Sequence, residues 1–253
     1  MNKRVLITAG ASGIGLVLAQ AFLAQGDRVW VTDIDLQTLT DMPEGIRGSR
    51  VDAADEAAMA ALFASVAADW GGLDVLCANA GTKGPTAPIE EMPLEGWRDC
   101  ISVSLDGAFL AAKYATPMMK SARAGTMIFT SSTAGLYGFP FRSPYAAAKW
   151  GMIGLMKSVA MELGPFGIRA NAICPGGVNG PRMDAVIAAE AKTKRMKPQA
   201  VRKGYEDGAA MGRFVDAEDI ANMAVFLASD GARLISGQSI AVDGFTVNPD
   251  PKV

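Results

Sequence analysis

Short runs of apolar and β-branched residues alternate along the chain with longer stretches of helical periodicity. Runs of the first kind predict buried strands, and stretches of the second kind predict helices. Strands that alternate with helices imply βαβ units with right-handed crossovers, and therefore a parallel sheet covered by helices on both faces. The predicted strands are 4–9, 28–33, 45–51, 73–78, 126–131, 167–173 and 238–242. The predicted helices are 13–25, 55–69, 95–120, 144–163 and 217–229.

This alternation continues through all 253 residues without a linker, a repeat or a low-complexity tract. The pattern therefore predicts one domain, 1–253, of the α/β class with a doubly wound parallel sheet of about seven strands. The exception is 176–212, where Gly-Pro punctuation gives way to charged helical patches such as 182–197. A segment this long between a helix and a strand is typical of a substrate loop or lid.

Composition excludes several classes of function. The chain is 50% apolar with a net charge of −2, and its acidic and basic residues are interspersed, so it carries no basic footprint for nucleic acid. Apolar runs stay below about 18 residues, which predicts no membrane span. Lys3 and Arg4 are followed by only a short apolar run that breaks into glycines, so this start is interpreted as a strand and not as a signal peptide. A cytoplasmic location is expected.

Cysteine and histidine usage narrows the chemistry further. Cys77, Cys100 and Cys174 lie far apart in the sequence and are predicted to be buried thiols in a reducing compartment. The chain contains no histidine, which removes histidine general bases and histidine-based zinc sites. No metal site is predicted, and any proton transfer must use another side chain.

A glycine-rich turn follows the first predicted strand and opens the first predicted helix. Gly10, Gly13 and Gly15 permit a tight turn, close approach of the backbone to a pyrophosphate, and close packing of the helix on the sheet. Ser12 and Ile14 lie in the same turn and are further candidates for cofactor contact. An ordinary strand–helix turn is the alternative for a glycine cluster considered alone.

An acidic residue at the end of the second predicted strand indicates which dinucleotide binds. Asp33 can accept hydrogen bonds from both ribose hydroxyls of the adenosine half and would repel a 2′-phosphate. Ser12, where a basic residue would help to bind NADP, points the same way, so NAD is the predicted cofactor. Asp52, beside Ala53 at the end of the third strand, can accept from the adenine amino group, although a simple turn acid explains it nearly as well.

A potential acid–base centre lies farther along the chain and consists of Ser132, Tyr145 and Lys149. Tyr145 and Lys149 are spaced i, i+4 and share one face of a predicted helix. A free phenol has a pKa of about 10, and a nearby ammonium lowers it toward working pH. Ser132, at the end of a neighbouring strand, can hydrogen-bond the reacting oxygen and polarise it.

Taken in this order, the motifs resemble those of the short-chain dehydrogenase/reductase family over nearly the whole chain. The resemblance implies a Rossmann-type fold and a homo-oligomer, with a tetramer expected. It also implies that Tyr145 is the general acid/base, that Lys149 additionally binds the nicotinamide ribose, and that Ser132 orients the substrate. The small residues after the fourth strand would leave room for the cofactor. The matching positions are the glycine turn, Asn79-Ala80-Gly81, Ser132, Tyr145 with Lys149, and 168–171 leading to Pro175 and Gly176.

The chain departs from the family pattern at three positions. Ser104 stands where the family usually has an asparagine that shapes a helix bulge and a water-linked proton relay, so an altered relay is expected. Ala9 stands where the first glycine is more frequent; either Gly10 takes over the turn or alanine fits. Gly180 replaces a frequent threonine, which leaves Val178 and backbone groups for that part of the cofactor.

Substrate contacts are expected from 133–142 and 176–212. Arg142 and Arg182 flank the predicted reaction centre, and two guanidiniums there would suit a carboxylate or sulfonate group, since arginine pairs well with such anions. A structural role for both is the alternative. Trp150 would add apolar surface to the pocket, although core packing explains it equally well.

The sequence therefore predicts an NAD-dependent oxidoreductase that interconverts a secondary alcohol and a ketone, with a small hydroxy acid or another anionic alcohol as candidate substrate. Alternatives are a 3-oxoacyl reductase using NADPH, a sugar or polyol dehydrogenase, and a catalytically silent dinucleotide-binding protein. Asp33 argues against the reductase that uses NADPH. The intact set of Ser132, Tyr145 and Lys149 argues against the catalytically silent protein.

Overall fold

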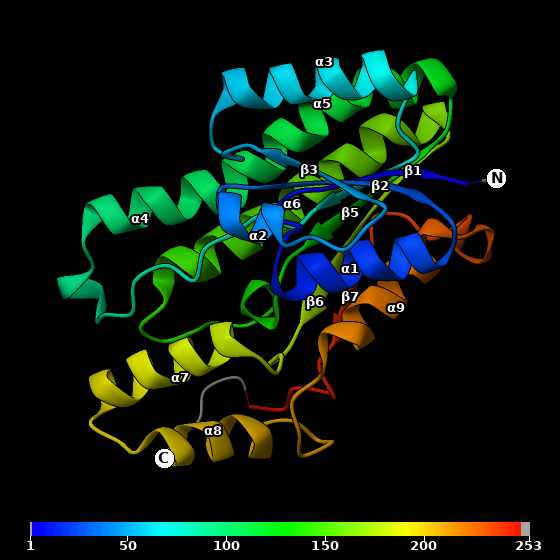
Figure 1. The fold of residues 1–253 in the computed structure, drawn as a ribbon. Helices are drawn as coiled ribbons and strands as arrows, with labels where there is room; N and C mark the ends of the chain where they lie inside the picture. The colour runs from blue at the N-terminus through cyan, green and yellow to red at the C-terminus, as the bar shows by residue number, and fades with distance from the viewer. Residues whose placement is uncertain (1, 249–253) are drawn as a thin grey trace.

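The computed structural model describes residues 2–248, and within them seven strands form one parallel sheet at the centre of the molecule (Figure 1). The strand order is β3-β2-β1-β4-β5-β6-β7. The order reverses direction between β1 and β4, which is where open α/β sheets bind ligands at the carboxyl ends of their strands. The strands are β1 (Arg4–Ile7), β2 (Arg28–Asp33), β3 (Ile46–Arg50), β4 (Val75–Ala78), β5 (Gly125–Thr130), β6 (Ile168–Pro175) and β7 (Ser239–Val242).

Helices cover both faces of this sheet, as the alternating pattern predicts. One face carries α3, α5 and α6, and the opposite face carries α1 and α9, which lie side by side (Figure 1). The helices are α1 (Gly13–Ala24), α2 (Leu36–Thr40), α3 (Glu56–Trp70), α4 (Leu94–Ile101), α5 (Gly107–Ala122), α6 (Ser143–Leu163), α7 (Pro181–Lys194), α8 (Pro198–Asp207) and α9 (Ala217–Ala228).

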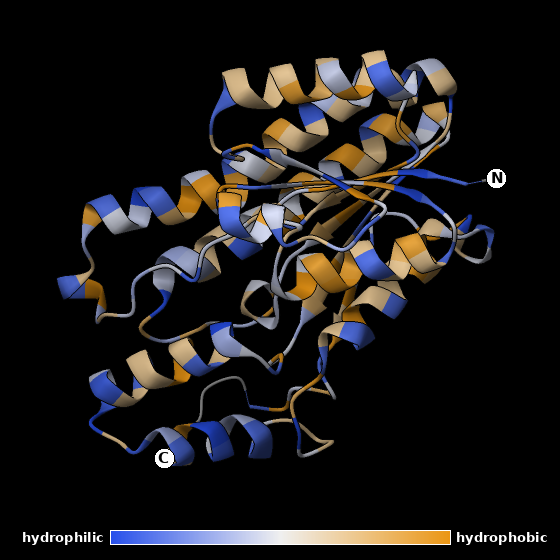
Figure 2. Ribbon diagram, viewed as in Figure 1, coloured by the Kyte–Doolittle hydropathy of each residue, from blue (hydrophilic) through white to orange (hydrophobic). Residues whose placement is uncertain are grey.

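The central strands are buried on both faces, which explains why they are continuously apolar instead of alternating. Every residue of β4 is buried, and the apolar colouring in Figure 2 is concentrated in the sheet and on the helix faces against it. At the edge, β3 carries polar side chains, and Arg47 of β3 covers the buried ring of Trp30 at 3.5 Å from the ring centroid. All seven predicted strands are confirmed, with ends that differ by at most two residues.

The predicted helix 95–120 needs a correction, because it is interrupted. A π-helical turn, Ser102–Asp106, separates α4 from α5 and inserts one residue into the regular spacing. Gly107, the first residue of α5, lies so close to Ala53 that a β-carbon there would be 3.2 Å from the Ala53 Cβ. Helix α2 was not predicted, since its five residues are too few to show helical periodicity.

The segment 176–212 is helical over most of its length. It forms α7 and α8, each with a proline in its first turn, where the missing N–H has no helical partner to lose. The two helices share a small apolar core that includes Ile187, Val201 and Phe214. The helical patch predicted at 182–197 is confirmed by α7, whereas a role of the segment as a substrate loop or lid stays a prediction. No helix of the described residues is both long and apolar enough to cross a membrane.

An ion pair joins the amino ends of β1 and β4, at the edge of the sheet away from the strand ends that bind ligands. The Arg4 guanidinium donates to both carboxylate oxygens of Asp74, at 2.8 and 2.7 Å, and the Arg4 backbone N–H donates at 2.8 Å. Burial alone would raise the pKa of Asp74, but the hydrogen bonds and positive charge of Arg4 lower it below its ordinary value.

We expect Asp74→Asn to lower the free energy of unfolding at pH 7 by about 1 to 2 kcal/mol, toward the lower end because the pair is partly solvated. A carboxyl with a lowered folded-state pKa stabilises the protein above its unfolded pKa, and this stabilisation is lost as the pH falls through the folded value. Urea unfolding from pH 7 down to about 3 should therefore show the two proteins converging below about pH 4. A difference that persists unchanged to the acid end would contradict this electrostatic origin.

Candidate active site

The glycine turn is shaped for close approach of a ligand. A β-carbon on Gly10 would lie 2.6 Å from the Val31 Cβ, and one on Gly15 would lie 2.1 Å from the Ala9 carbonyl oxygen. Gly13 has a φ of +51° and open space where a side chain would be. Two of the glycines therefore let the helix pack on the sheet, and the third leaves the amino end of α1 open toward an anion.

Ala9 occupies the left-handed region itself, with a φ of +49°. The structure thus decides between the two expectations for this turn: alanine takes the unusual backbone conformation, and Gly10 serves close packing instead. A non-glycine residue in this region carries a strain of about 1–2 kcal/mol.

Asp33 lies beside this turn at the carboxyl end of β2. Its carboxylate accepts hydrogen bonds from the backbone N–H groups of Ala11 at 3.3 Å and Ile34 at 2.8 Å, which fix its position at the mouth of the turn. Asp52 is exposed and accepts from the Ala54 N–H at 2.9 Å, as a turn acid does. Its neighbour Ala53 is buried.

The end of β4 is tied directly to the glycine turn. The Asn79 side chain donates to the carbonyl oxygens of Thr8 at 3.2 Å and Ala9 at 3.0 Å, and the backbone N–H groups of Asn79 and Ala80 both donate to the Thr8 hydroxyl. Sequence reasoning did not single out Thr8. Its position in the turn was visible, but nothing in a single sequence shows that its buried hydroxyl bridges two strands.

Ser132, Tyr145 and Lys149 are brought together at the carboxyl end of β5. The Lys149 ammonium is buried and donates to the Thr130 carbonyl oxygen at 2.6 Å. The Ser131 hydroxyl donates to the Lys149 carbonyl oxygen at 3.0 Å, so the strand end and α6 are joined at two points. The Ser132 hydroxyl accepts from the Ala134 N–H at 3.1 Å and lies near enough to the Tyr145 phenol to help lower its pKa.

Electrostatics at this centre favour the ionised phenol. Burial by itself would raise the pKa of Tyr145, but the positive charges of Lys149, Arg182 and Arg142, together with the hydrogen bond from Ser132, lower it below its ordinary value. Burial also lowers the pKa of Lys149, against the opposing charge of Tyr145. The mutual attraction of the two groups is the arrangement that an acid–base tyrosine requires.

Ser104 lies in the π-helical turn and is completely buried. Its hydroxyl accepts from the Thr82 N–H at 3.3 Å. A β-carbon on Gly81 would lie 3.4 Å from both the Ser104 hydroxyl and the Lys149 ammonium, so these groups converge around one glycine. The helix bulge is therefore present although serine replaces the usual asparagine.

Arg142 and Arg182 both lie near Tyr145, although they come from different elements. Arg142 is 7% exposed and donates to the Lys83 carbonyl oxygen at 3.1 Å, and Arg182 is exposed on α7 and donates to the Gly81 carbonyl oxygen at 2.8 Å. Trp150 is 52% exposed, and its indole N–H donates at 3.2 Å to the carbonyl oxygen of Tyr137, outside the group around Tyr145.

Past β6, the chain turns sharply toward α7. A β-carbon on Gly176 would lie 2.8 Å from the Asp243 Cβ, directly after the buried Pro175. Val178 pairs with Val215 in an isolated bridge. Gly180, with a φ of +138°, has a backbone conformation that threonine would not adopt without strain, which accounts for the departure from the family pattern.

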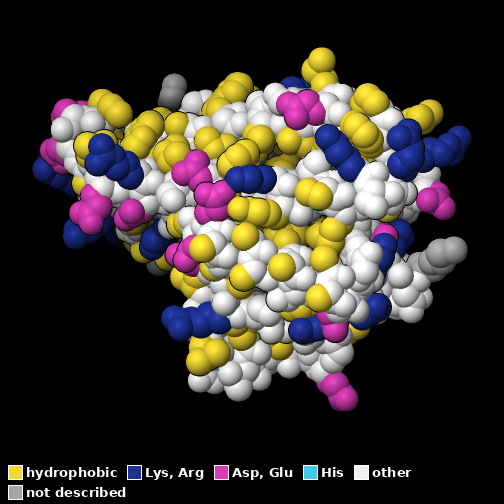
Figure 3. Space-filling model, turned by 90° about the horizontal axis from the view of Figure 1, so that it is seen from above, with side chains coloured by type: hydrophobic (Ala, Val, Ile, Leu, Met, Phe, Trp, Pro, Cys, Tyr) yellow, Lys and Arg dark blue, Asp and Glu magenta, His cyan; other side chains and the backbone are white. Residues whose placement is uncertain are grey.

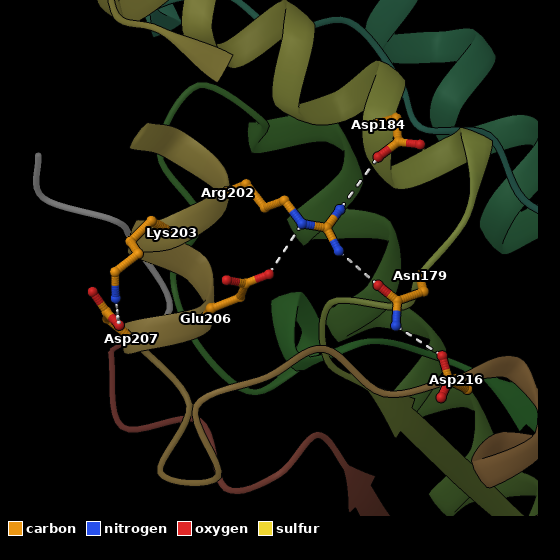
Figure 4. Close-up of polar contacts among 7 residues, drawn as sticks. All are labelled: Asn179, Asp184, Arg202, Lys203, Glu206, Asp207 and Asp216. Atoms are coloured by element: carbon orange, nitrogen blue, oxygen red, sulfur yellow. Dashed lines mark hydrogen bonds and ion pairs between the residues drawn. The ribbon is translucent and has the colours of Figure 1, made fainter. Parts of the chain in front are cut away.

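One arginine connects α7 and α8 to the body of the fold (Figure 4). The Arg202 guanidinium of α8 donates to Asn179 at 2.8 Å, to Glu206 at 3.0 Å and, at 3.4 Å, to Asp184 of α7. Asn179 in turn donates to Asp216, the N-cap residue of α9, at 2.7 Å. Helices α7 and α8 are therefore linked through side chains to a helix that packs on the sheet.

The three cysteines are buried, as the sequence analysis predicts. Cys77, Cys100 and Cys174 are buried and free, and burial raises the pKa of the Cys77 thiol to about 12. Among residues 2–248 there is no cluster of acidic, cysteine or histidine side chains that could hold a metal ion.

The chain is similar to known proteins over nearly its full length. A family model described as enoyl-(acyl carrier protein) reductase matches residues 8–245. D-beta-hydroxybutyrate dehydrogenase of Rhizobium meliloti (strain 1021) is 34% identical, covering 96% of this chain and 98% of the relative. Cis-4-hydroxycyclohexanecarboxylate dehydrogenase of Sinomonas cyclohexanicum is also 34% identical, covering 96% of each. The crystal structure of an NAD+-bound xylitol dehydrogenase superposes with a TM-score of 0.92 at 26% identity, covering 95% of this chain and 98% of that one.

These relatives and the geometry around Tyr145 indicate the same family and the same kind of reaction. The sheet order, the glycine turn at the switch point and the serine–tyrosine–lysine group all occur in the relation that the sequence motifs require. The chain belongs to the short-chain dehydrogenase/reductase family, and it is an oxidoreductase that acts on a secondary alcohol or the corresponding ketone.

Proposed function

We propose that this enzyme uses NAD(H) to interconvert a small hydroxy acid and the matching oxo acid, with Tyr145 as general acid/base. The observation that carries the proposal is the convergence of one ammonium and two guanidinium groups on the phenol of Tyr145. A centre this positive favours both an ionised tyrosine and an anionic substrate.

The proton chemistry follows from the positions of three side chains. In alcohol oxidation, the phenolate oxygen of Tyr145 accepts the hydroxyl proton of the substrate, and in ketone reduction the phenol returns it. The Ser132 hydroxyl bonds the same substrate oxygen and the tyrosine, which orients the reacting carbon. Lys149, held by Thr130, keeps a positive charge behind the phenol.

The residues around the switch point fit a dinucleotide. The open space at Gly13 and the amino end of α1 would accommodate a pyrophosphate, with Ser12 and Ile14 beside it. Asp33 would bind the adenosine ribose, and Asp52 would accept from the adenine. When bound, the nicotinamide supplies or accepts the hydride. Further candidate contacts are Gly10, Gly15, Ala53, Asn79, Ala80, Gly81, Lys149, Pro175, Gly176 and Val178.

Of the two arginines, we assign the anionic group of the substrate to Arg182. Arg182 is exposed, and it donates to the Gly81 carbonyl oxygen with one nitrogen of its planar fork. Arg142 was an equal candidate in the sequence, but its guanidinium is buried between other groups. Two relatives are named for hydroxy acids, D-beta-hydroxybutyrate and cis-4-hydroxycyclohexanecarboxylate, which supports an acidic substrate. A polyol is the second candidate, because the NAD+-bound structural neighbour is a xylitol dehydrogenase.

We further propose a homotetramer in a reducing, cytoplasmic setting. Large apolar side chains stay exposed on α5 and α6, with Phe109 at 48%, Trp150 at 52% and Met161 at 81%. Figure 3 shows hydrophobic side chains spread among charges of both signs on the face seen from above, rather than a basic patch. Light scattering at micromolar concentration should give about four times the 26.4 kDa chain mass, and a monomer would contradict the proposal.

Tyr145→Phe should lower kcat at least about 100-fold, because it removes the proton donor, while NADH affinity changes less than about threefold because the ring stays. Steady-state kinetics and fluorescence titration of NADH measure the two effects. Tyr114→Phe, which alters a tyrosine of α5 that bonds to Glu56, is the matched control and should behave like the wild type. A Tyr145→Phe variant with more than about a tenth of wild-type kcat would rule out the acid–base role.

Asp33 should make the enzyme prefer NAD over NADP by about 100-fold or more in kcat/KM, because it binds ribose hydroxyls and repels a 2′-phosphate. Asp33→Ala should narrow this preference, whereas Asp41→Asn, a change of an exposed acid in the same region, should leave it intact. Equal wild-type kcat/KM values with the two cofactors would refute the assignment.

Arg182→Ala should lower kcat/KM for the best acidic substrate by about 30-fold or more, because a desolvated contact between arginine and a carboxylate is lost. A panel of hydroxy acids, sugars and polyols, followed by NADH absorbance, identifies that substrate. A neutral analogue should be nearly indifferent to the change, and Arg195→Ala at the far end of α7 is the matched control.

Two results would end the anionic-substrate proposal. One is a wild-type-like Arg182→Ala variant with the best acid, and the other is a best substrate that is an uncharged sugar or polyol.

A further inference from the structure

Arg142 is a buried cation with few partners of its own. It is the N-cap residue of α6, and only 7% of its surface is exposed. One guanidinium nitrogen donates to the Lys83 carbonyl oxygen at 3.1 Å, and its Nε atom has no hydrogen-bond partner among the described residues. A buried charge with an unpartnered donor costs stability, so its retention calls for a role beyond packing.

Two aromatic rings hold this guanidinium in place. Its central carbon lies 4.3 Å from the ring centroid of Tyr145 and 5.6 Å from that of Phe139. Cations over aromatic faces within about 6 Å are attracted by the ring quadrupole, and more strongly where water is excluded. The charge of Arg142 is thereby fixed against the ring that carries the reacting phenol.

The lid supports this arrangement from the other side. Phe139 stacks on Tyr205 of α8, with ring centroids 6.1 Å apart and planes 14° from parallel. The Tyr205 hydroxyl hydrogen-bonds to Glu190 of α7, a buried carboxylate that also pairs with Lys194 at 2.9 Å. A continuous column of side chains therefore runs from α7 through α8 and Phe139 to Arg142.

We propose that Arg142 is a positioning residue of the reaction: clamped between Phe139 and Tyr145, it holds a fixed positive charge on the catalytic ring, and its place depends on the aromatic contact with the lid. This role differs from that of Arg182, which is exposed and is assigned to the substrate. It rests on the acid–base role of Tyr145 and not on the nature of the substrate.

Other charged and titratable groups also face this centre. Lys149 of α6 and Arg182 of α7 add positive charge to that of Arg142 and favour the phenolate, although burial opposes them and raises the pKa of Tyr145. Cys100 of α4 and Cys174 of β6 act on Lys149, but burial raises the pKa of both thiols, which leaves them neutral at working pH. Arg142 is thus one of three cations that together lower the pKa of Tyr145 below its ordinary value.

The test reads the ionisation of Tyr145 directly, without a substrate. The chain contains four tyrosines, so labelling with tyrosine enriched in ¹³C at Cζ gives few signals, and the one missing from Tyr145→Phe is that of Tyr145. Its chemical shift, followed against pH in the purified full-length protein, gives the pKa. The wild type should titrate below the ordinary value of about 10.

Arg142→Gln should raise this pKa by about 1 or more, because one cation within a few ångströms of the phenol is removed. Arg142→Lys keeps the charge but loses the planar guanidinium that the rings hold, and it should raise the pKa less than Arg142→Gln does. Arg195→Gln removes an exposed charge at the far end of α7 and serves as the matched control. Phe139→Leu removes the ring between Arg142 and the lid and should raise the pKa by a smaller amount.

Each result decides the proposal. A wild-type pKa at or above about 10, or an unchanged pKa in Arg142→Gln, overturns it. If Arg142→Gln does not fold, Phe139→Leu takes its place, and an unchanged pKa there overturns the proposal. A purely structural arginine would lower the melting temperature without moving the ionisation of Tyr145, so thermal unfolding is recorded alongside. Failure of the hydroxy-acid assignment would leave all of these values untouched.

Discussion

The active site depends on one buried hydrogen bond, from the Lys149 ammonium to the Thr130 carbonyl oxygen. A carbonyl oxygen at the end of a central strand is a natural partner for a cation, because the rest of that strand bonds to its neighbours. This contact fixes α6 relative to β5 and sets Tyr145, one helical turn earlier, over the carboxyl edge of the sheet. The charge that tunes the tyrosine is therefore also the charge that positions it.

The same edge gathers the cofactor side of the site through polar side chains that are internal to the fold. Asn79 and Thr8 join the ends of β4 and β1, so that the end of β4 is fixed to the glycine turn. In open parallel sheets ligands bind in the crevice outside the carboxyl ends of the strands, which is where these side chains lie, and not at the Arg4–Asp74 edge.

Much of this arrangement could be predicted from the sequence, since buried strands and long amphipathic helices leave periodic signals. The seven strands and the relation of Tyr145 to Lys149 belong to this class. The π-helical turn at Ser102–Asp106 could not be located by periodicity, because an extra residue in a helix leaves the apolar pattern nearly intact. The sequence also placed Arg142 and Arg182 near the site but could not show that one is buried against a ring and the other open to solvent, since burial depends on contacts between distant segments.

The arginine hub at Arg202 has a consequence for how this enzyme would release product. Because its guanidinium bonds to both α7 and α8, the two helices are cross-linked and would move as a single body, with glycines and not helical residues absorbing the change in backbone angles. The hydrogen bond from Arg182 to the Gly81 carbonyl oxygen then holds α7 against the segment that follows β4. Moving these helices away from the sheet would therefore break the bond from Arg182 to Gly81 together with the chain of bonds from Arg202 through Asn179 to Asp216.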